Sequence, residues 1–214
     1  MQRFFVAPIF MRGVFMKLES LFRRCLSIEY IHIEGDGSYA YERIGNTLYL
    51  YFECSNGKLD WKNNLDFPIK AYKGLFIHRG FLRVFKSIVP YVEGLILDTS
   101  LDEIVITGYS HGGALACLFC EYAWFVRSDL RGKIQGYGFG APRVMWGILG
   151  KNRHRWDGFY VIRNINDIVT HLPPALFGYR HVGTLIKIGV RGKYSLIDAH
   201  RQENILYELS KLAL

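Results

Sequence analysis

The chain has 214 residues, of which half are apolar, 15% are aromatic and 21% are charged. This composition excludes a disordered or low-complexity chain, and the length suffices for one large domain with a sizeable core. The net charge of +8 favours anionic partners such as nucleic acid or an acidic lipid surface. The basic residues are spread along the chain without a run of five, so we do not expect nucleic-acid binding.

Four cysteines, too few for a disulfide scaffold, stand at Cys25, Cys54, Cys117 and Cys120. The last two have the spacing of a zinc or redox pair. No second pair of cysteines and no nearby pair of histidines completes a set of four ligands. We therefore expect buried, reduced thiols, no metal, no cofactor and a cytoplasmic location.

Residues 1–15 form an extension of uncertain status, and residues 16–214 are expected to form a single domain. The extension contains a short apolar run, but Arg12 interrupts it and no small-residue cleavage site follows, which disfavours a secretory signal. The most apolar stretch, residues 113–126, contains Glu121 and is too short to span a bilayer.

Residues 17–28 have apolar side chains at the spacing of an amphipathic helix. We expect this helix to cover a sheet. Its polar face contains Lys17, Arg23 and Arg24, which leaves a second interpretation open, a helix that lies on a membrane surface.

The remaining pattern is that of an α/β protein with antiparallel strands at its start. Residues 38–43 and 46–54 are predicted to form an antiparallel pair, and residues 56–67 a polar loop. A helix is predicted over residues 81–97, where Pro90 should kink or divide it. The later elements are predicted as strands at 103–107, 133–139, 159–163 and 182–188 and helices at 111–126, 145–149 and 202–213.

Residues 108–112 read GYSHG and match the pattern GxSxG between a predicted strand and a predicted buried helix. A sharp strand-to-helix turn strains the backbone of Ser110 and exposes its hydroxyl above the sheet. Glycine is needed on either side, because a Cβ there would collide with a neighbouring element. The pattern predicts that Ser110 is a nucleophile.

A serine nucleophile needs a base and an acid that orients the base, and in this type of fold they follow in the order Ser, Asp or Glu, His. Asp167 comes directly after the predicted strand 159–163, at the sheet edge where α/β sites are built. His200 comes 33 residues later, before the last helix, and is the expected base. The rival residues are the histidines His171 and His181 and the acids Asp157 and Asp198.

Acyl transfer also needs donors for the oxyanion. The backbone N–H of His111, directly after the nucleophile, is the expected first donor. Ser55 follows a predicted strand and could supply the second. From the residues alone, a donor and an ordinary turn residue are equally good interpretations of Ser55.

The sequence resembles the class 3 lipases, the fungal-lipase-like members of the α/β-hydrolase superfamily. The residues that carry this resemblance lie between about 46 and 205 and include FECS at 52–55, DW at 60–61, HRGF at 78–81, GYSHGGALA at 108–116, GFGAPR at 138–143, NDIV at 166–169, LPP at 172–174 and HVG at 181–183. The resemblance implies an α/β-hydrolase fold, Ser110 as nucleophile, Asp167 as acid, His200 as base and Ser55 as an oxyanion donor. It also implies a lid over residues 56–67.

This chain departs from the family pattern in three places. Glu53 and Cys54 replace the usual Arg-Gly before the oxyanion residue, and Tyr109 replaces a frequent His before the nucleophile. The lid segment has few large apolar residues, so we expect weak or absent interfacial activation.

We expect a serine esterase or lipase that acts on carboxylic esters of lipids, such as tri- or monoacylglycerols. The alternatives are a phospholipase that contacts anionic membranes and a non-catalytic lipid-binding relic.

Overall fold

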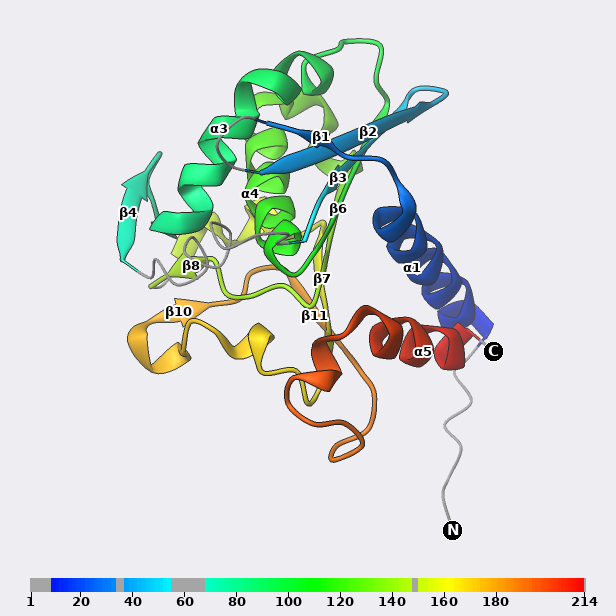
Figure 1. Cartoon of the computed structure of the whole chain (residues 1–214). Helices are drawn as coiled ribbons and strands as arrows, with labels where there is room; N and C mark the ends of the chain where they lie inside the picture. Colours follow the sequence, from blue (N-terminus) through cyan, green and yellow to red (C-terminus); the bar gives the residue numbers. More distant parts are fainter. Residues whose placement is uncertain (1–8, 34–36, 55–67, 148–149, 214) are drawn as a thin grey trace.

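The computed structural model describes residues 9–33, 37–54, 68–147 and 150–213, and a large twisted sheet lies at its centre (Figure 1). Within the described residues the strand order of this sheet is β1-β2-β3-β6-β7-β9-β11. The strands are β1 (Ile31–His32), β2 (Ser38–Ile44), β3 (Thr47–Phe52), β6 (Glu103–Tyr109), β7 (Ile134–Phe139), β9 (Phe159–Asn164) and β11 (Thr184–Ile188).

The sheet is mostly parallel. Strands β3, β6, β7, β9 and β11 pair in parallel, whereas β1 and β2 pair antiparallel at the starting edge. The expected α/β-hydrolase fold with antiparallel N-terminal strands is thereby confirmed. Because the parallel strands run in one direction, the turns that follow β6, β7 and β9 meet at one edge of the sheet.

Helices cover both faces of the sheet (Figure 1). The helices α3 (Arg79–Ile96) and α4 (His111–Val126) pack on one face, where their apolar side chains form a core with β3 and β6. The helices α1 (Ile9–Ser27) and α5 (Gln202–Ala213) pack against each other and on the opposite face. The 3₁₀ helices are η1 (Ser128–Lys133), η2 (Gly150–Trp156), η3 (Val169–His171), η4 (Ala175–Phe177) and η5 (Asp198–His200).

The first helix covers the sheet. It begins at Ile9 and buries Phe15, Leu18 and Phe22, so the boundary drawn between residues 15 and 16 falls inside α1. Helix α3 is continuous through Pro90. Its buried face anchors it on both sides of the proline, which offsets the lost backbone hydrogen bond.

A second, smaller sheet has the strand order β10-β8-β5-β4 among the described residues. Its strands are β4 (Ile69–Tyr72), β5 (Leu75–His78), β8 (Met145–Trp146) and β10 (Tyr179–Arg180). The predicted helix at 145–149 is wrong where the structure describes it, because Met145 pairs with Ile77 of β5 and Arg180 of β10. Residues 148 and 149 lie outside the described residues.

Candidate active site

Ser110 occupies the turn between β6 and α4, as the GxSxG pattern predicts. Its backbone has φ 54° and ψ −117°, a conformation that a residue with a Cβ rarely adopts. The turn is held because the Ser110 amide donates to the carbonyl of Phe139 on β7 at 2.8 Å. Hence the surrounding strands stabilise the strained residue.

The glycines of the motif allow close backbone approach. A Cβ at Gly112 would lie 2.0 Å from the carbonyl oxygen of Phe52, at the end of β3, and a Cβ at Gly108 would lie 2.0 Å from the carbonyl oxygen of Gly112. Backbone atoms cannot yield as a flexible side chain does. The first turn of α4 therefore packs directly on the end of β3, the strand that leads towards Ser55.

His200 links the serine to a carboxylate. Its Nε2 lies 2.8 Å from Ser110 Oγ, and its Nδ1 lies 2.8 Å from Asp167 Oδ2. These distances bring together three residues that come from the turn after β6, the turn after β9 and the end of η5. A protonated Nδ1 that donates to Asp167 leaves Nε2 as an acceptor for the serine hydroxyl.

The carboxylate of Asp167 is fully buried and held from two sides. Its Oδ1 accepts the Val169 amide at 2.8 Å, while Oδ2 contacts His200. Gly140 makes room for this pair, since a Cβ at that position would lie 2.9 Å from His200 Cε1 and 3.3 Å from Asp167 Oδ2. Asp167 therefore holds the imidazole at Nδ1, and the missing side chain of Gly140 leaves room for the ring.

One of the two rival histidines, His181, hydrogen-bonds to a backbone carbonyl. Its Nε2 hydrogen-bonds to the carbonyl of Thr170 at 2.7 Å. Burial, together with the positive charges of Arg143 and Arg163, lowers the pKa of His181 to about 4. His181 is therefore a neutral, structural histidine. Burial likewise lowers the pKa of His171.

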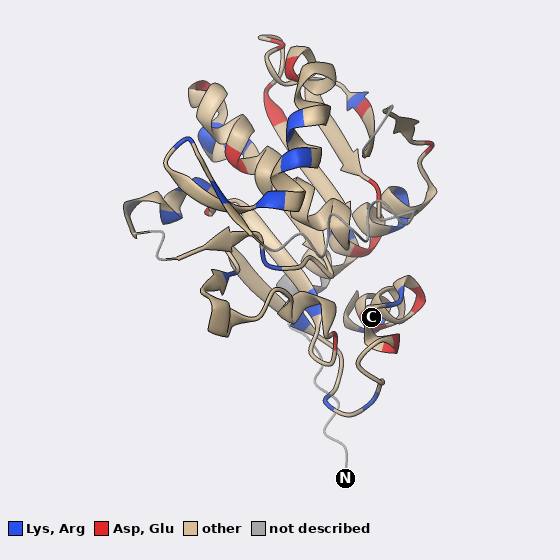
Figure 2. Cartoon of the chain, turned by 60° about the vertical axis from the view of Figure 1, so that its left-hand side comes forward, with Lys and Arg blue, Asp and Glu red and all other residues tan. Residues whose placement is uncertain are grey.

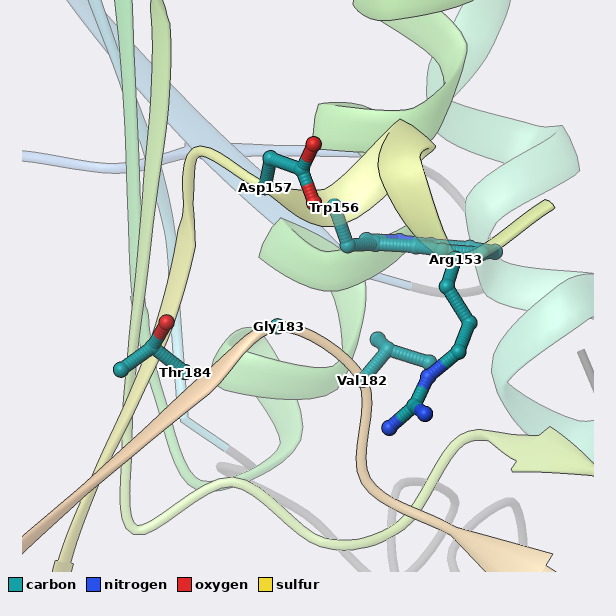
Figure 3. Close-up of a pocket in the computed structure, with 6 residues that line it drawn as sticks. All are labelled: Arg153, Trp156, Asp157, Val182, Gly183 and Thr184. Atoms are coloured by element: carbon teal, nitrogen blue, oxygen red, sulfur yellow. The ribbon is translucent and has the colours of Figure 1, made fainter. Parts of the chain in front are cut away.

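The two rival acids lie in other environments. Asp198 accepts a hydrogen bond from Ser195 at 2.6 Å and pairs with Arg201 at 3.1 Å. Asp157 comes just before β9 and lines a cavity of about 260 Å³ with Arg153, Trp156, Val182, Gly183 and Thr184 (Figure 3). Because this cavity lies where β9 and β11 begin, it is at the opposite edge of the sheet from Ser110.

Tyr109 is a site residue whose role the sequence did not predict. Its hydroxyl donates to the backbone carbonyl of His200 at 2.5 Å, and its ring stacks on the imidazole with 5.3 Å between centroids. The edge of its ring meets Phe22 of α1. The available signal was the unusual residue before Ser110, but its partner lies 91 positions away in the chain.

His111 is the first residue of α4, so its N–H belongs to the helix turn whose donors lack intrahelical partners. Ser55 and the predicted lid at residues 56–67 lie outside the described residues.

Exposed apolar side chains lie close to the three linked residues. Ile168 follows Asp167 directly, and its amide donates to the carbonyl of Leu196 at 3.2 Å. Leu196 and Ile197 are exposed by 59% and 71%, in the loop that leads to His200. The rim of the site therefore offers apolar contacts.

Residues 49–177, more than half of the chain, match the family model described as lipase (class 3). The chain belongs to the class 3 lipase family. The resemblance drawn from the motifs is confirmed.

Curated relatives of the chain include a lipase of Rhizomucor miehei, which is 31% identical over 148 residues. A secreted mono- and diacylglycerol lipase of Malassezia restricta is 32% identical over 144 residues. These matches cover 64% and 63% of the chain but only 40% and 44% of the relatives, so the chain matches less than half of their length.

The fold is that of solved fungal lipases. A fungal lipase–inhibitor complex, titled as a model for interfacial activation, superposes with a TM-score of 0.72 at 23% identity and covers 84% of this chain and 80% of that chain. The Rhizomucor miehei lipase in its propeptide complex gives 0.70 at 20% identity, with 95% and 80% covered. Among the described residues, no helix is both long and apolar enough to cross a membrane.

Proposed function

We propose that this member of the class 3 lipase family is a serine hydrolase that cleaves carboxylic esters of lipids, with tri- and monoacylglycerols as the expected substrates. The observation that carries the proposal is the chain of two 2.8 Å contacts from Ser110 through His200 to Asp167. No other charged or nucleophilic group is needed for ester hydrolysis by this route.

In the proposed reaction His200 Nε2 accepts the hydroxyl proton as Ser110 Oγ attacks the ester carbonyl carbon. The His111 amide and Ser55 stabilise the oxyanion. The tetrahedral intermediate collapses, and His200 donates the proton to the departing alcohol. Water then attacks the acyl-serine while His200 accepts a proton from it. As the bond between the acyl carbon and Ser110 Oγ breaks, His200 returns the proton to Oγ and the carboxylic acid leaves.

Asp167 has two tasks in this mechanism. Its Oδ2 holds the imidazole in the tautomer that leaves Nε2 free to accept a proton, and its charge stabilises the imidazolium that forms. The Val169 amide on Oδ1 keeps the carboxylate in that orientation.

The apolar rim supports a lipid substrate. Ile168, Leu196 and Ile197 are exposed beside the reactive groups, where a single acyl chain could contact them. Two relatives that are named mono- and diacylglycerol lipases support the same substrate class.

We also propose that the protein works in a reducing compartment such as the cytoplasm. Cys25 and Cys120 are buried, and burial raises the pKa of both thiols to about 12, which keeps them unreactive. Two relatives are named as secreted lipases. Recovery of the native protein from the culture medium instead of the cell extract would reject this location.

The central test is Ser110→Ala, with p-nitrophenyl esters of two to sixteen carbons as substrates. We expect the variant to lose about 10⁶-fold in kcat on every ester that the wild type hydrolyses. Ser210→Ala, which removes a hydroxyl from the far end of α5, is the matched control and should keep full activity. More than a few per cent residual activity in Ser110→Ala would reject Ser110 as nucleophile.

A fluorophosphonate probe separates an enzyme from a non-catalytic lipid-binding relic. We expect the probe to label the wild type and the Ser210→Ala variant and to leave Ser110→Ala unlabelled. A folded wild-type protein that stays unlabelled would support the relic.

A further inference from the structure

Positive charge is concentrated in one part of the chain. Residues 67–92 contain Lys70, Lys73, Arg79, Arg83 and Lys86 and no Asp or Glu. Residues 55–66 add two lysines and two aspartates, so residues 55–92 contribute +5 of the net +8. This positive net charge counts every Asp, Glu, Lys and Arg of residues 55–92, so ion pairs among them do not change it.

The fold places these cations on one surface. Helix α3 buries its apolar stripe against α4, which leaves Arg79, Arg83 and Lys86 exposed at helical spacing. The β4–β5 hairpin lies alongside and contributes Lys70. The four side chains line a groove of about 360 Å³ together with Ala71 and Leu82. Figure 2 turns this side of the molecule towards the viewer and marks Lys and Arg along the ribbon.

Apolar side chains are exposed on the same hairpin. β4 is the edge strand of the small sheet and lies at the outside of the molecule (Figure 1). Ile69 on β4 is 39% exposed, and Phe76 on β5 is 50% exposed with its ring edge against Trp146, 5.7 Å away. The strand register places Ile69 and Phe76 on the face of the hairpin opposite to Lys70. The outer edge at β4 thus offers cations on the side of α3 and apolar side chains on its other side, the two kinds of contact that the headgroup phosphates and acyl chains of a bilayer surface can take.

The other cationic helix fits this partner less well. On α1, Arg23 pairs with Glu19 at 2.6 Å and Arg24 pairs with Glu42. Lys17 donates to the side chain of Gln135 at 2.9 Å. Helix α1 uses its apolar face to cover the sheet, so that face is not available to a membrane.

We propose that the β4–β5 hairpin and α3 form a docking surface for an anionic lipid bilayer. Lys70, Arg83 and Lys86 contact phosphate-bearing headgroups, and Ile69 and Phe76 enter the apolar layer. The surface is separate from Ser110, Asp167 and His200, so docking does not require catalysis.

The test uses the Ser110→Ala protein, so that vesicles stay chemically intact, and measures co-sedimentation with phosphatidylcholine vesicles with and without phosphatidylglycerol. The variant Lys70→Gln/Lys86→Gln removes two groove lysines. Its control, Lys133→Gln/Lys187→Gln, removes two exposed lysines elsewhere and changes the net charge equally.

We expect the groove variant to bind anionic vesicles about 25-fold more weakly, since each surface cation contributes about fivefold at low salt. The control should bind within about twofold of the parent protein, and added salt should weaken the parent towards the groove variant. Equal losses in the two double variants, or no loss in the groove variant, would overturn the proposal.

Phe76→Ser distinguishes a bilayer from a soluble polyanion without changing the charge. We expect it to weaken binding to anionic vesicles and to leave retention on heparin unchanged. Tighter binding of the parent to single-stranded DNA than to anionic vesicles, with no effect of Phe76→Ser on the vesicles, would overturn the bilayer as partner. Unchanged turnover of a soluble short-chain ester by both double variants with Ser110 intact shows that each is folded.

Discussion

The Tyr109 hydroxyl donates to the backbone carbonyl of His200 at 2.5 Å while the two rings stack, so one side chain holds both the backbone and the ring of the proposed base. Because Tyr109 precedes the proposed nucleophile, it ties the nucleophile turn to the loop of the base. The phenol is largely buried, which together with nearby Asp167 and Glu203 raises the Tyr109 pKa and keeps it a hydrogen-bond donor.

Tyr109→Phe should keep the stacked ring and lose the hydroxyl. We expect kcat to fall about 3- to 10-fold with little change in KM, because one neutral hydrogen bond contributes about 1 kcal/mol to the position of the imidazole. Steady-state kinetics on a soluble ester measure this effect.

Tyr41→Phe is the matched control for that substitution, since Tyr41 is an exposed tyrosine on β2. A fall in kcat that is equal in both variants would reject the positioning role of Tyr109. Rescue is also testable, because Tyr109→His restores a polar ring and should recover part of the loss.

Asp167→Asn should lower kcat by about 10⁴-fold while the protein stays folded. Because the Val169 amide needs the remaining side-chain oxygen as its acceptor, the NH2 group of the asparagine would face Nδ1 and donate to it. Nε2 would then carry the proton and could not accept one from Ser110. Single-turnover kinetics check the rate of acylation, and circular dichroism checks the fold. An Asn variant within tenfold of wild type would show that another acid orients His200.

Gly140→Ala should lower the rate of ester hydrolysis, because the added methyl group would collide with the imidazole of His200. The new Cβ would lie 2.9 Å from His200 Cε1 and 3.0 Å from its Nδ1, so the ring must shift. Since a displacement of about 1 Å costs on the order of 100-fold in rate, we expect a loss of that order. Kinetics on a short-chain ester provide the measurement.

Gly45→Ala is the control for this variant. It separates the collision of the added methyl group from the backbone strain of a positive φ. Gly45 has φ +59°, close to the +57° of Gly140, but a Cβ there would meet nothing within 4 Å. Both variants should therefore lose similar stability, and only Gly140→Ala should lose activity. Equal activities in the two variants would reject the contact argument.

His181 should make the free energy of unfolding depend on pH. Its folded pKa of about 4 lies below the ordinary 6.5, so the folded state favours the neutral ring. The stabilisation is present above about pH 6.5 and is lost as the pH falls towards 4, by an amount on the order of 3 kcal/mol. Urea unfolding between about pH 7 and pH 4 measures this slope.

His181→Gln keeps a donor for the Thr170 carbonyl and removes the titration, so its free energy of unfolding should vary less over that range. Leu176→Ala, a change at an exposed side chain without a titratable group, should retain the wild-type slope. Identical slopes for all three proteins would assign the pH dependence to other groups.

The sequence predicts the strand-to-helix turn at Ser110 well because the determinants of that turn are local. An apolar strand, two glycines around Ser110 and an apolar helix follow one another within residues 103–126, and β6 and α4 occupy those positions. Asp167 was placed by the same rule, since it follows a recognisable strand. These residues need only neighbours in the chain to be recognised.

The small sheet could not be predicted in the same way. Its strands are two to four residues long, too short to show a period of two, and Met145 finds its partners at Ile77 and Arg180. The contact of Tyr109 with His200 is equally non-local, because it depends on where the loop before α5 is held. Pairings over such separations depend on the packing of the whole fold and not on local preference.

Helices α1 and α5, at the two ends of the described chain, pack against each other and together support the region around His200 (Figure 1). Helix α5 begins two residues after His200, and Phe22 of α1 touches Tyr109, so the first helix supports the imidazole through both neighbours. We expect local opening of this pair to need less energy than melting of the parallel strands, because core strands open only with the whole domain. On gradual heating, loss of ester hydrolysis should therefore precede loss of the sheet signal, and cooling from that intermediate range should restore turnover.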